Sequence, residues 1–294
     1  MKEPVFTGVA TALVTPFRAG QLDLDAFDHL LSVQLHAGVS AVVVCGTTGE
    51  ASTLTEEERR TLIARAAALC AGRCKVIAGI GTNSTVSSVR LAQQAENSGA
   101  DALLAVTPYY NKASQSGLVA HYTAIADATA VPLIAYNVPS RTGVNLQPET
   151  CRALSLHPRI NGVKEAGGDL SQVARIRNLC GDALHIWSGN DDQITAVMAL
   201  GGKGVISVLS NLRPRLTVEI AEACLRQDYS ASARLQCACM PLIDALFSDV
   251  NPIPIKAAME DAGFCTGELR LPLTPISEEK RTTLRAAMLL CAER

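Results

Sequence analysis

The stretch Ile160-Asn161-Gly162-Val163-Lys164-Glu165-Ala166-Gly167-Gly168-Asp169 joins a short apolar run to a glycine-rich segment and places a lysine at the junction. Such a run, bounded by glycines, is typical of a buried strand that ends in a loop. Burial disfavours the ammonium form of lysine, and the neutral amine can attack a carbonyl to form a Schiff base. Taken alone, the segment also fits an ordinary lysine at a strand end whose ammonium group reaches water.

Similar apolar runs recur along the chain, about 20 to 35 residues apart. With the run above they give eight predicted strands, at residues 8–14, 41–45, 76–79, 102–106, 133–137, 162–164, 184–188 and 204–208. Strands that are apolar throughout predict a parallel sheet covered on both faces.

Helical patterns lie between most of these runs. One, at residues 59–70, follows the capping box Thr55-Glu56-Glu57-Glu58, and another covers residues 85–98 and stops at Gly99. Eight strand–helix units within about 210 residues predict an α/β fold, a closed (β/α)8 TIM barrel. An open, doubly wound sheet is the alternative, because periodicity alone does not exclude it.

The strand pattern stops after about residue 212. Residues 214–226, 230–247, 254–263 and 278–292 read as helices, and Asn251-Pro252-Ile253-Pro254 as a rigid break between two of them. The expected organisation is therefore a (β/α)8 catalytic barrel over residues 1–224 and a C-terminal helical domain over residues 225–294, packed on the barrel.

Composition restricts the classes of function. Of the 294 residues, 48% are hydrophobic and 18% charged, and the net charge is −2, which gives no reason to expect a nucleic-acid or anionic membrane partner. The sequence also lacks a signal-peptide pattern at its start and an uninterrupted apolar stretch long enough for a membrane span, so a soluble cytoplasmic protein is expected. The ten cysteines form no CxxC pair, and we expect reduced core thiols.

The predicted strands end in unusually polar segments. In a barrel, residues at these carboxyl-terminal ends carry the chemistry. The segments are Gly46-Thr47-Thr48-Gly49-Glu50, Thr107-Pro108-Tyr109-Tyr110-Asn111-Lys112, Tyr136-Asn137-Val138-Pro139-Ser140-Arg141-Thr142-Gly143, Lys164-Glu165 and Ser188-Gly189-Asn190-Asp191.

Together these segments can bind a small carboxylated carbonyl compound. Lys164 would attack the ketone, the Gly-Thr-Thr-Gly turn offers donors for a carboxylate, a tyrosine near the lysine would move protons, and Arg141 would hold a second carboxylate. Each member also has an ordinary structural explanation: a plain turn, a core aromatic at Tyr136, a surface charge at Arg141, and a rim or subunit contact at Tyr109-Tyr110. Their conjunction favours the catalytic interpretation.

A metal-dependent aldolase is the main chemical competitor. It would need histidines and carboxylates clustered at strand ends. The histidines do not form an HxH or HExxH pattern and do not fall on those loops; they are His29, His36, His121, His157 and His185. The sequence therefore favours amine catalysis with no metal. It contains no GxGxxG or Walker motif, which argues against a nucleotide-binding site.

The motifs, in this order, resemble the dihydrodipicolinate synthase (4-hydroxy-tetrahydrodipicolinate synthase) family. They are Gly46-Thr-Thr-Gly-Glu50, Thr107-Pro-Tyr-Tyr-Asn-Lys112, Tyr136-Asn-Val-Pro-Ser-Arg-Thr-Gly143, Gly162-Val-Lys-Glu-Ala166, Gly201-Gly-Lys-Gly-Val-Ile-Ser207 and Asn251-Pro-Ile-Pro254. The resemblance covers nearly the whole chain. Its parent group is the class I, Schiff-base pyruvate aldolases related to N-acetylneuraminate lyase.

The resemblance implies a catalytic set. Lys164 corresponds to the lysine that forms an imine with pyruvate, and Tyr136 to the tyrosine that donates and accepts protons beside it. Thr47 and Tyr110 correspond to the other hydroxyls of a proton relay, in which the tyrosine at Tyr110 reaches into the neighbouring subunit's site. A homo-oligomer is implied, because the relay needs at least a dimer; a tetramer built from two dimers is expected, and the sequence does not separate the two.

It also implies substrate contacts. Thr48 corresponds to a ligand of the pyruvate carboxylate, Ile206 to a pyruvate-contacting backbone position, and Gly189 to a residue lining the site. Arg141 corresponds to the arginine that binds the carboxylate of the second substrate, L-aspartate 4-semialdehyde. The implied reaction is a condensation and ring closure on the diaminopimelate route to lysine, with no cofactor.

Two other functions stay open from the sequence. One is another Schiff-base pyruvate aldolase or dehydratase, such as a sugar-acid lyase, although these generally lack the arrangement around Arg141 and Tyr110. The other is a non-catalytic pyruvate-binding or regulatory protein that keeps the fold, against which the lysine, tyrosines and threonine are all present.

A possible effector site departs from the family pattern. Asn83 and Tyr109 correspond to residues of a lysine-binding site between subunits. However, Glu56 and Arg59 stand where lysine-sensitive bacterial members commonly carry histidines, and Ser87 replaces a glutamate that pairs with the effector's amine. Losing that carboxylate removes the charge partner of a cation, so weak or absent feedback by lysine is expected.

Overall fold

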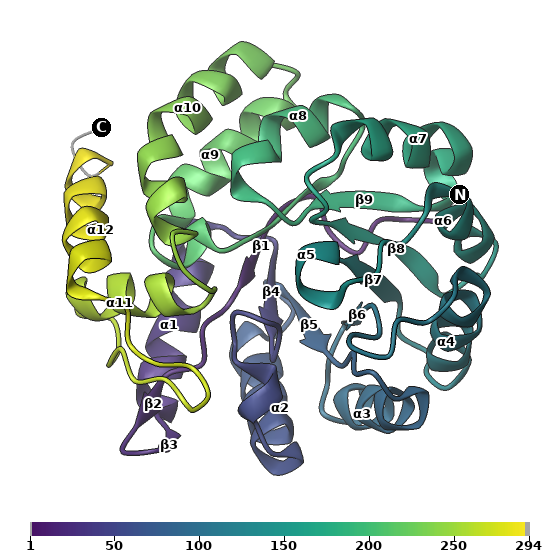
Figure 1. The fold of residues 1–294 in the computed structure, drawn as a ribbon, viewed down its shortest axis with the longest axis horizontal. Helices are drawn as coiled ribbons and strands as arrows, with labels where there is room; N and C mark the ends of the chain where they lie inside the picture. The colour runs from purple at the N-terminus through teal and green to yellow at the C-terminus, as the bar shows by residue number, and fades with distance from the viewer. Residues whose placement is uncertain (1, 292–294) are drawn as a thin grey trace.

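Eight parallel strands close into a barrel in the computed structural model, which describes residues 2–291 (Figure 1). They are β1 (Gly8–Ala12), β4 (Ala41–Val44), β5 (Lys75–Gly79), β6 (Ala102–Val106), β7 (Leu133–Asn137), β8 (Ile160–Glu165), β9 (His185–Ser188) and β10 (Gly204–Ser207). The strands follow one another around the barrel in chain order, and β1 pairs with both β4 and β10. The (β/α)8 barrel is confirmed, and the open doubly wound sheet was wrong.

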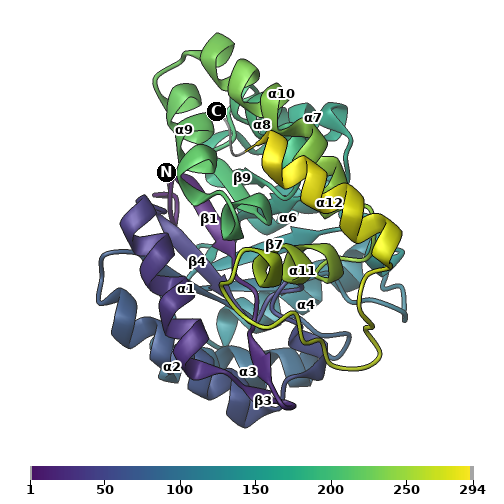
Figure 2. The ribbon, with the colours of Figure 1, turned by 90° about the vertical axis from the view of Figure 1, so that its left-hand side faces the viewer.

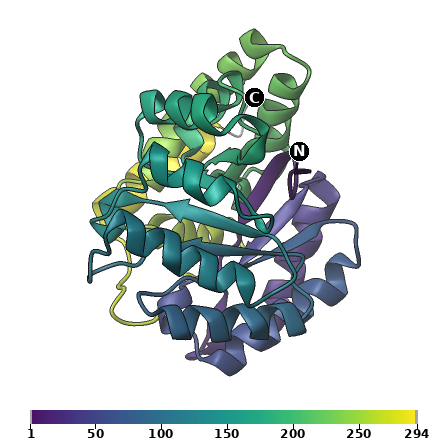
Figure 3. The same cartoon turned by 90° about the vertical axis from the view of Figure 1, so that its right-hand side faces the viewer.

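Helices cover the outside of the strands, as the two side views show (Figures 2 and 3). Those that follow barrel strands are α2 (Glu56–Cys70), α3 (Thr85–Asn97), α4 (Gln115–Asp127), α5 (Pro139–Thr142), α6 (Pro148–Ser155), α7 (Leu170–Cys180), α8 (Ile194–Ala199) and α9 (Pro214–Leu225). Helix α1 (Leu24–Ala37) follows a small hairpin made of β2 (Phe17–Arg18) and β3 (Gln21–Leu22). This hairpin was not predicted from the sequence. The predicted capping box is present: the Glu58 N–H donates to Thr55 Oγ1 (3.2 Å) and the Thr55 N–H to Glu58 Oε2 (2.9 Å).

Strand β1 ends at Ala12, before the expected end at residue 14. The Leu13 N–H still donates to the Val43 carbonyl (3.0 Å), but the Val14 N–H donates to Asn211 Oδ1 (3.1 Å). The chain leaves the strand ladder there because a side chain, and not a neighbouring strand, accepts its hydrogen bond.

Three helices follow the barrel: α10 (Tyr229–Leu246), α11 (Ile253–Asp261) and α12 (Glu278–Leu290). They lie together on one side of the barrel, beside α9 and β1 (Figures 1 and 2). Of the expected break at 251–254, Asn251 and Pro252 lie between α10 and α11, whereas Ile253 and Pro254 already belong to the first turn of α11. Residue 292 of the last expected helix lies outside the described residues. Helix α9 contacts β1 and α1 and ends at Leu225; the division between residues 224 and 225 stays a prediction.

Two aromatic side chains pack against each other among the aliphatic side chains of the barrel interior. The rings of Phe6 and Trp187 stack with centroids 5.1 Å apart, and Trp187 Nε1 donates to the Phe6 carbonyl (3.2 Å). A Cβ at Gly162 would lie 2.4 Å from the Trp187 ring, so this position on β8 accepts only glycine. Eight of the ten cysteines are buried, as expected of core residues. The expectation was wrong for Cys237, which is exposed, and Cys265 is only half-buried.

Candidate active site

Lys164 and Tyr136 lie side by side at the ends of two neighbouring strands. They are register partners on β8 and β7, and Lys164 Nζ lies 4.3 Å from the centroid of the Tyr136 ring. Lys164 is 5% exposed and Tyr136 is 7% exposed. Alternate residues of a strand face opposite sides, and here the alternation turns both side chains toward the barrel interior.

Burial sets the ionisation of this pair. It lowers the pKa of Lys164 to about 8; the buried carboxylate of Asp191 opposes the shift and the Arg141 guanidinium adds to it. Burial raises the pKa of Tyr136, against the smaller opposing effects of Arg141 and the Thr47 hydroxyl. Near neutral pH the site thus holds a lysine with a substantial neutral fraction beside a protonated phenol.

A cavity of about 340 Å³ opens over the lysine. Its lining brings together six of the residues predicted from the sequence: Lys164, Tyr136, Thr47, Thr48, Arg141 and Gly189. They come from four segments that are separated in the chain, and they meet because the carboxyl ends of parallel strands share one rim.

Gly189 leaves space beside the lysine. A Cβ at this position would lie 2.6 Å from the Ala166 Cβ and 3.0 Å from Lys164 Cε. Any larger residue would therefore displace the lysine side chain. Ile206, in contrast, is fully buried among the apolar side chains of the barrel interior and does not line the cavity.

The wall opposite the strand ends comes from the C-terminal part of the chain. Phe247, Asp249, Val250 and Asn251 line the cavity. From the sequence, this stretch is expected only to lead into a helix break. No local pattern indicates its role, because Asn251 reaches the site through hydrogen bonds with Arg141 and Thr48, which lie 110 and 203 positions earlier in the chain.

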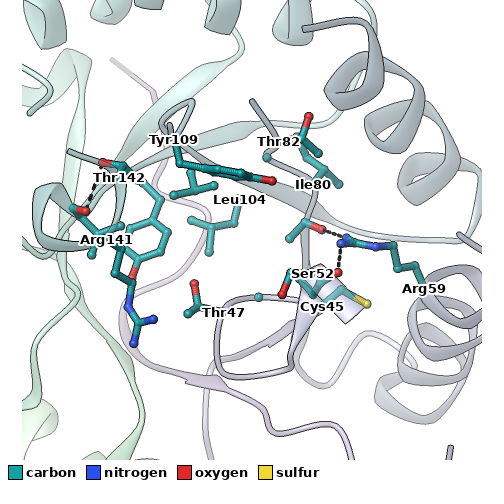
Figure 4. Close-up of a pocket in the computed structure, with 17 residues that line it drawn as sticks. Cys45, Thr47, Ser52, Arg59, Ile80, Thr82, Leu104, Tyr109, Arg141 and Thr142 are labelled. Atoms are coloured by element: carbon teal, nitrogen blue, oxygen red, sulfur yellow. Dashed lines mark hydrogen bonds between the residues drawn. The ribbon is translucent and has the colours of Figure 1, made fainter. Parts of the chain in front are cut away.

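A second cavity, of about 250 Å³, adjoins the first and shares Thr47, Tyr136 and Arg141 with it (Figure 4). Tyr109 and Arg59 also line it, from different segments of the chain. The Arg59 guanidinium donates to the carbonyls of Gly79 (3.1 Å) and Ala51, so its hydrogen bonds hold two surrounding backbone segments.

Tyr110 lies apart from the other relay hydroxyls within the chain. Its side chain is 90% exposed, and its φ of +73° is unusual for a tyrosine. Asn83 likewise lines neither cavity; its carbonyl accepts a hydrogen bond from Asn111 Nδ2 (2.9 Å). The single chain thus assembles the lysine, Tyr136 and Thr47, but not the tyrosine at Tyr110.

Across residues 2–291, His, Cys, Asp and Glu side chains form no group of three or more that could hold a metal ion. Within the same range, the helices are all too short or too polar to cross a membrane.

Comparison with known proteins identifies the family. The profile of the Dihydrodipicolinate synthetase family matches residues 5–289. The chain belongs to this family. The 4-hydroxy-tetrahydrodipicolinate synthase of Exiguobacterium sibiricum is 52% identical over 285 residues, 97% of each chain.

Solved structures of family members superpose closely on the chain. The dihydrodipicolinate synthase from Thermotoga maritima matches with a TM-score of 0.96 and 43% identity, over 98% of this chain and 99% of that one. A dihydrodipicolinate synthase variant described as monomeric matches with the same TM-score and identity, over 98% of this chain and 97% of that one.

Proposed function

We infer that this chain is a 4-hydroxy-tetrahydrodipicolinate synthase, a lyase that condenses pyruvate with L-aspartate 4-semialdehyde. The observation that carries the inference is the buried Lys164 beside Tyr136 at the strand ends, with a lysine pKa of about 8. The curated relatives that share nearly the whole chain carry this enzyme's name. We place the reaction on the diaminopimelate route to lysine, in the cytoplasm.

The first half of the proposed reaction forms the imine. Neutral Lys164 Nζ attacks the ketone carbon of pyruvate, and the resulting carbinolamine loses water when the phenol of Tyr136 protonates its hydroxyl group. Loss of a methyl proton then gives the enamine. Lys164 Nζ lies 4.3 Å from the centroid of the Tyr136 ring, so the residue that we propose as proton donor neighbours the reacting amine.

The second half joins the carbon skeletons. The enamine carbon attacks the aldehyde carbon, whose oxygen takes up a proton. The amine of the former semialdehyde then attacks the imine carbon, closes the ring and releases Lys164. No step requires a cofactor, because the imine nitrogen itself accepts and returns the electron pair.

Two carboxylate positions fit the cavity. We place the pyruvate carboxylate at the Thr48 hydroxyl and its surrounding turn, and the carboxylate of the semialdehyde at Arg141. The backbone of Ile206 stays a predicted pyruvate contact, although Ile206 does not line the cavity. Thr48 and Arg141 both line the cavity that contains Lys164. Arginine suits this role because its planar guanidinium can bind a carboxylate through two hydrogen bonds.

We propose that Tyr110 completes the Thr47–Tyr136 relay of a neighbouring subunit, in a homotetramer built from two dimers. Its 90% exposure and its separation from the cavity support a partner in another chain. A positive φ costs a tyrosine backbone strain, and the exposed side chain makes little packing contact within its own subunit that would offset this cost. The same exposure is expected at an interface residue viewed in one subunit.

We further propose that lysine binds weakly near Asn83 and Tyr109. The Glu56 carboxylate is already paired with Arg90, and Ser87 offers no charge to an ammonium group. The Arg59 guanidinium adds a positive charge to the adjoining cavity. A cationic effector therefore meets no free carboxylate among these residues.

The test is a condensation assay that follows consumption of both substrates. Equimolar loss of pyruvate and L-aspartate 4-semialdehyde supports the proposal, and Lys164→Arg should abolish it. Arg141→Met should raise KM for the semialdehyde at least about tenfold, as expected for loss of a charged hydrogen bond, while Arg152→Met, a change of an exposed arginine on α6, should not. Cleavage of a sugar acid without use of the semialdehyde would favour the sugar-acid lyase instead.

A further inference from the structure

The segment at residues 251–256 runs from the cavity wall into the first turn of helix α11. At its start, Asn251 lines the cavity and is 8% exposed; at its end, Lys256 is fully buried. Each makes side-chain contacts with the 46–50 loop at the end of β4. The helical extension is thus joined to the part of the site where we place a substrate carboxylate.

Asn251 contacts both proposed carboxylate-binding residues. Its side-chain Nδ2 donates to Thr48 Oγ1 (3.0 Å), and its backbone carbonyl accepts from Arg141 Nη2 (3.1 Å). A threonine hydroxyl has one hydrogen to donate. Since Thr48 Oγ1 accepts from Asn251, that hydrogen is directed away from Asn251 and remains for an incoming carboxylate. The bond to Arg141 similarly fixes one nitrogen of the guanidinium and leaves its other N–H groups for a ligand.

A buried ion pair holds this segment in place. Lys256 Nζ lies 2.6 Å from Glu50 Oε1, and both side chains are fully buried. Lys256 also donates to the Thr15 carbonyl (3.0 Å), and Glu50 Oε2 accepts from the Arg270 N–H (3.0 Å). Breaking such a pair leaves an unpaired buried charge, so its geometry is strongly enforced.

The opposite side of the same loop is held as well. Thr15 Oγ1 donates to the Gly49 carbonyl (2.8 Å), and a Cβ at Gly49 would lie 3.1 Å from the Leu13 carbonyl. The loop is therefore fixed between the end of β1 and the 251–256 segment, and Thr48 has little freedom to move.

We propose that Asn251, anchored by the Lys256–Glu50 ion pair, is a positioning residue that orients Thr48 and Arg141 toward the two substrate carboxylates. This rests on the proposed function. It makes the helical extension part of the binding machinery and not only a covering of the barrel. Neither Asn251 nor Lys256 needs to touch the reacting atoms for this role.

The test is Asn251→Leu, which keeps the side-chain shape and the backbone carbonyl but removes the hydrogen bond to Thr48. Borohydride trapping of the pyruvate imine is measured against pyruvate concentration. The concentration for half-maximal trapping should rise about tenfold, the usual effect of losing one hydrogen bond to a ligand-binding group, with an unchanged plateau. In a Thr48→Val protein, which lacks the hydroxyl, adding Asn251→Leu should produce no further rise, because Asn251 acts on the pyruvate site through that hydroxyl.

Arg281→Met is the matched control. It removes the two ion pairs that Arg281 of α12 makes with Glu260 and Asp261 of α11, and so loosens the extension without touching the 46–50 loop. It should leave half-maximal trapping unchanged. Thermal unfolding is recorded for each variant, and Asn251→Ala replaces Asn251→Leu should the latter not fold.

The outcomes separate the two claims. The positioning role alone is overturned if the wild-type protein traps pyruvate but the pyruvate concentration for half-maximal trapping is unchanged in the Asn251 variant. It is also overturned if Arg281→Met raises that concentration as much as the Asn251 variant does. No adduct in the wild-type protein overturns the proposed function and this inference with it.

Discussion

The pH dependence of imine formation tests how the fold activates Lys164. Its pKa is lowered to about 8 from an ordinary value of 10.5, chiefly by burial. At pH 7 a group with a pKa of 8 is about one-tenth neutral, whereas one at 10.5 is only about 0.03% neutral. The protein thus raises the concentration of reactive amine by about 300-fold, at a cost of about 3 kcal/mol in folding free energy while the lysine is charged.

The direction follows from which form reacts. Since only the neutral amine attacks pyruvate, the initial rate of adduct trapping at sub-saturating pyruvate should rise with pH and level off above about pH 8. Between pH 7 and pH 9 the rise should be about tenfold for a pKa of 8, and about 100-fold without a plateau for an ordinary lysine. Tyr136 does not interfere, because burial raises its pKa above 10 and the phenol stays protonated in this range.

The chain contains its own control for this experiment. Lys256 is more deeply buried than Lys164, and burial lowers its pKa too, but the Glu50 carboxylate contacts its ammonium group. It should carry no adduct at any pH, because it is enclosed and ion-paired. A rate that keeps rising tenfold per pH unit through pH 9 would refute the claim that burial activates Lys164.

Further predictions concern the anchor, the effector and the subunit contact. Lys256→Met should lower the free energy of unfolding by about 3–5 kcal/mol, because it leaves the Glu50 carboxylate buried without a partner. Adding Glu50→Gln should recover most of that loss, because it removes the unpaired charge. Urea titrations measure both variants, and a Lys256→Met protein as stable as the wild type would contradict the prediction. Lysine at about 1 mM should change the initial rate less than twofold, since Ser87 offers no carboxylate, and strong inhibition would disprove this. Tyr110→Phe and Lys164→Ala should each be inactive alone, yet regain activity when their subunits are exchanged; no recovery in mixed oligomers would place Tyr110 outside the neighbouring site.

Local sequence patterns predicted the barrel well, for a physical reason. A strand buried on both faces must be apolar throughout, and a helix start needs its capping groups within a few residues, so both leave local signatures. β6 and β7 have the bounds expected from the sequence, and α2 begins at Glu56, directly after Thr55, the first residue of its capping box and three residues before the expected start at 59. Lys164 could be singled out because a lysine rarely ends an apolar run.

Long-range contacts left no such signature. The Asn251–Thr48 hydrogen bond joins residues 203 positions apart, and the Lys256–Glu50 pair joins residues 206 positions apart. Lys256 reads in the sequence as an ordinary helix lysine, and its complete burial follows only from where α11 packs. Asp191 was seen as part of a polar strand end, but its influence on Lys164 depends on burial that no local pattern reports.

The most direct test of the whole account is borohydride reduction of the wild-type protein with pyruvate, followed by peptide mass spectrometry. The account predicts one pyruvate-derived adduct, on the peptide that contains Lys164. A folded protein that yields no adduct, or yields one on another lysine such as Lys112 or Lys203, would contradict the assignment of Lys164 as the imine-forming residue.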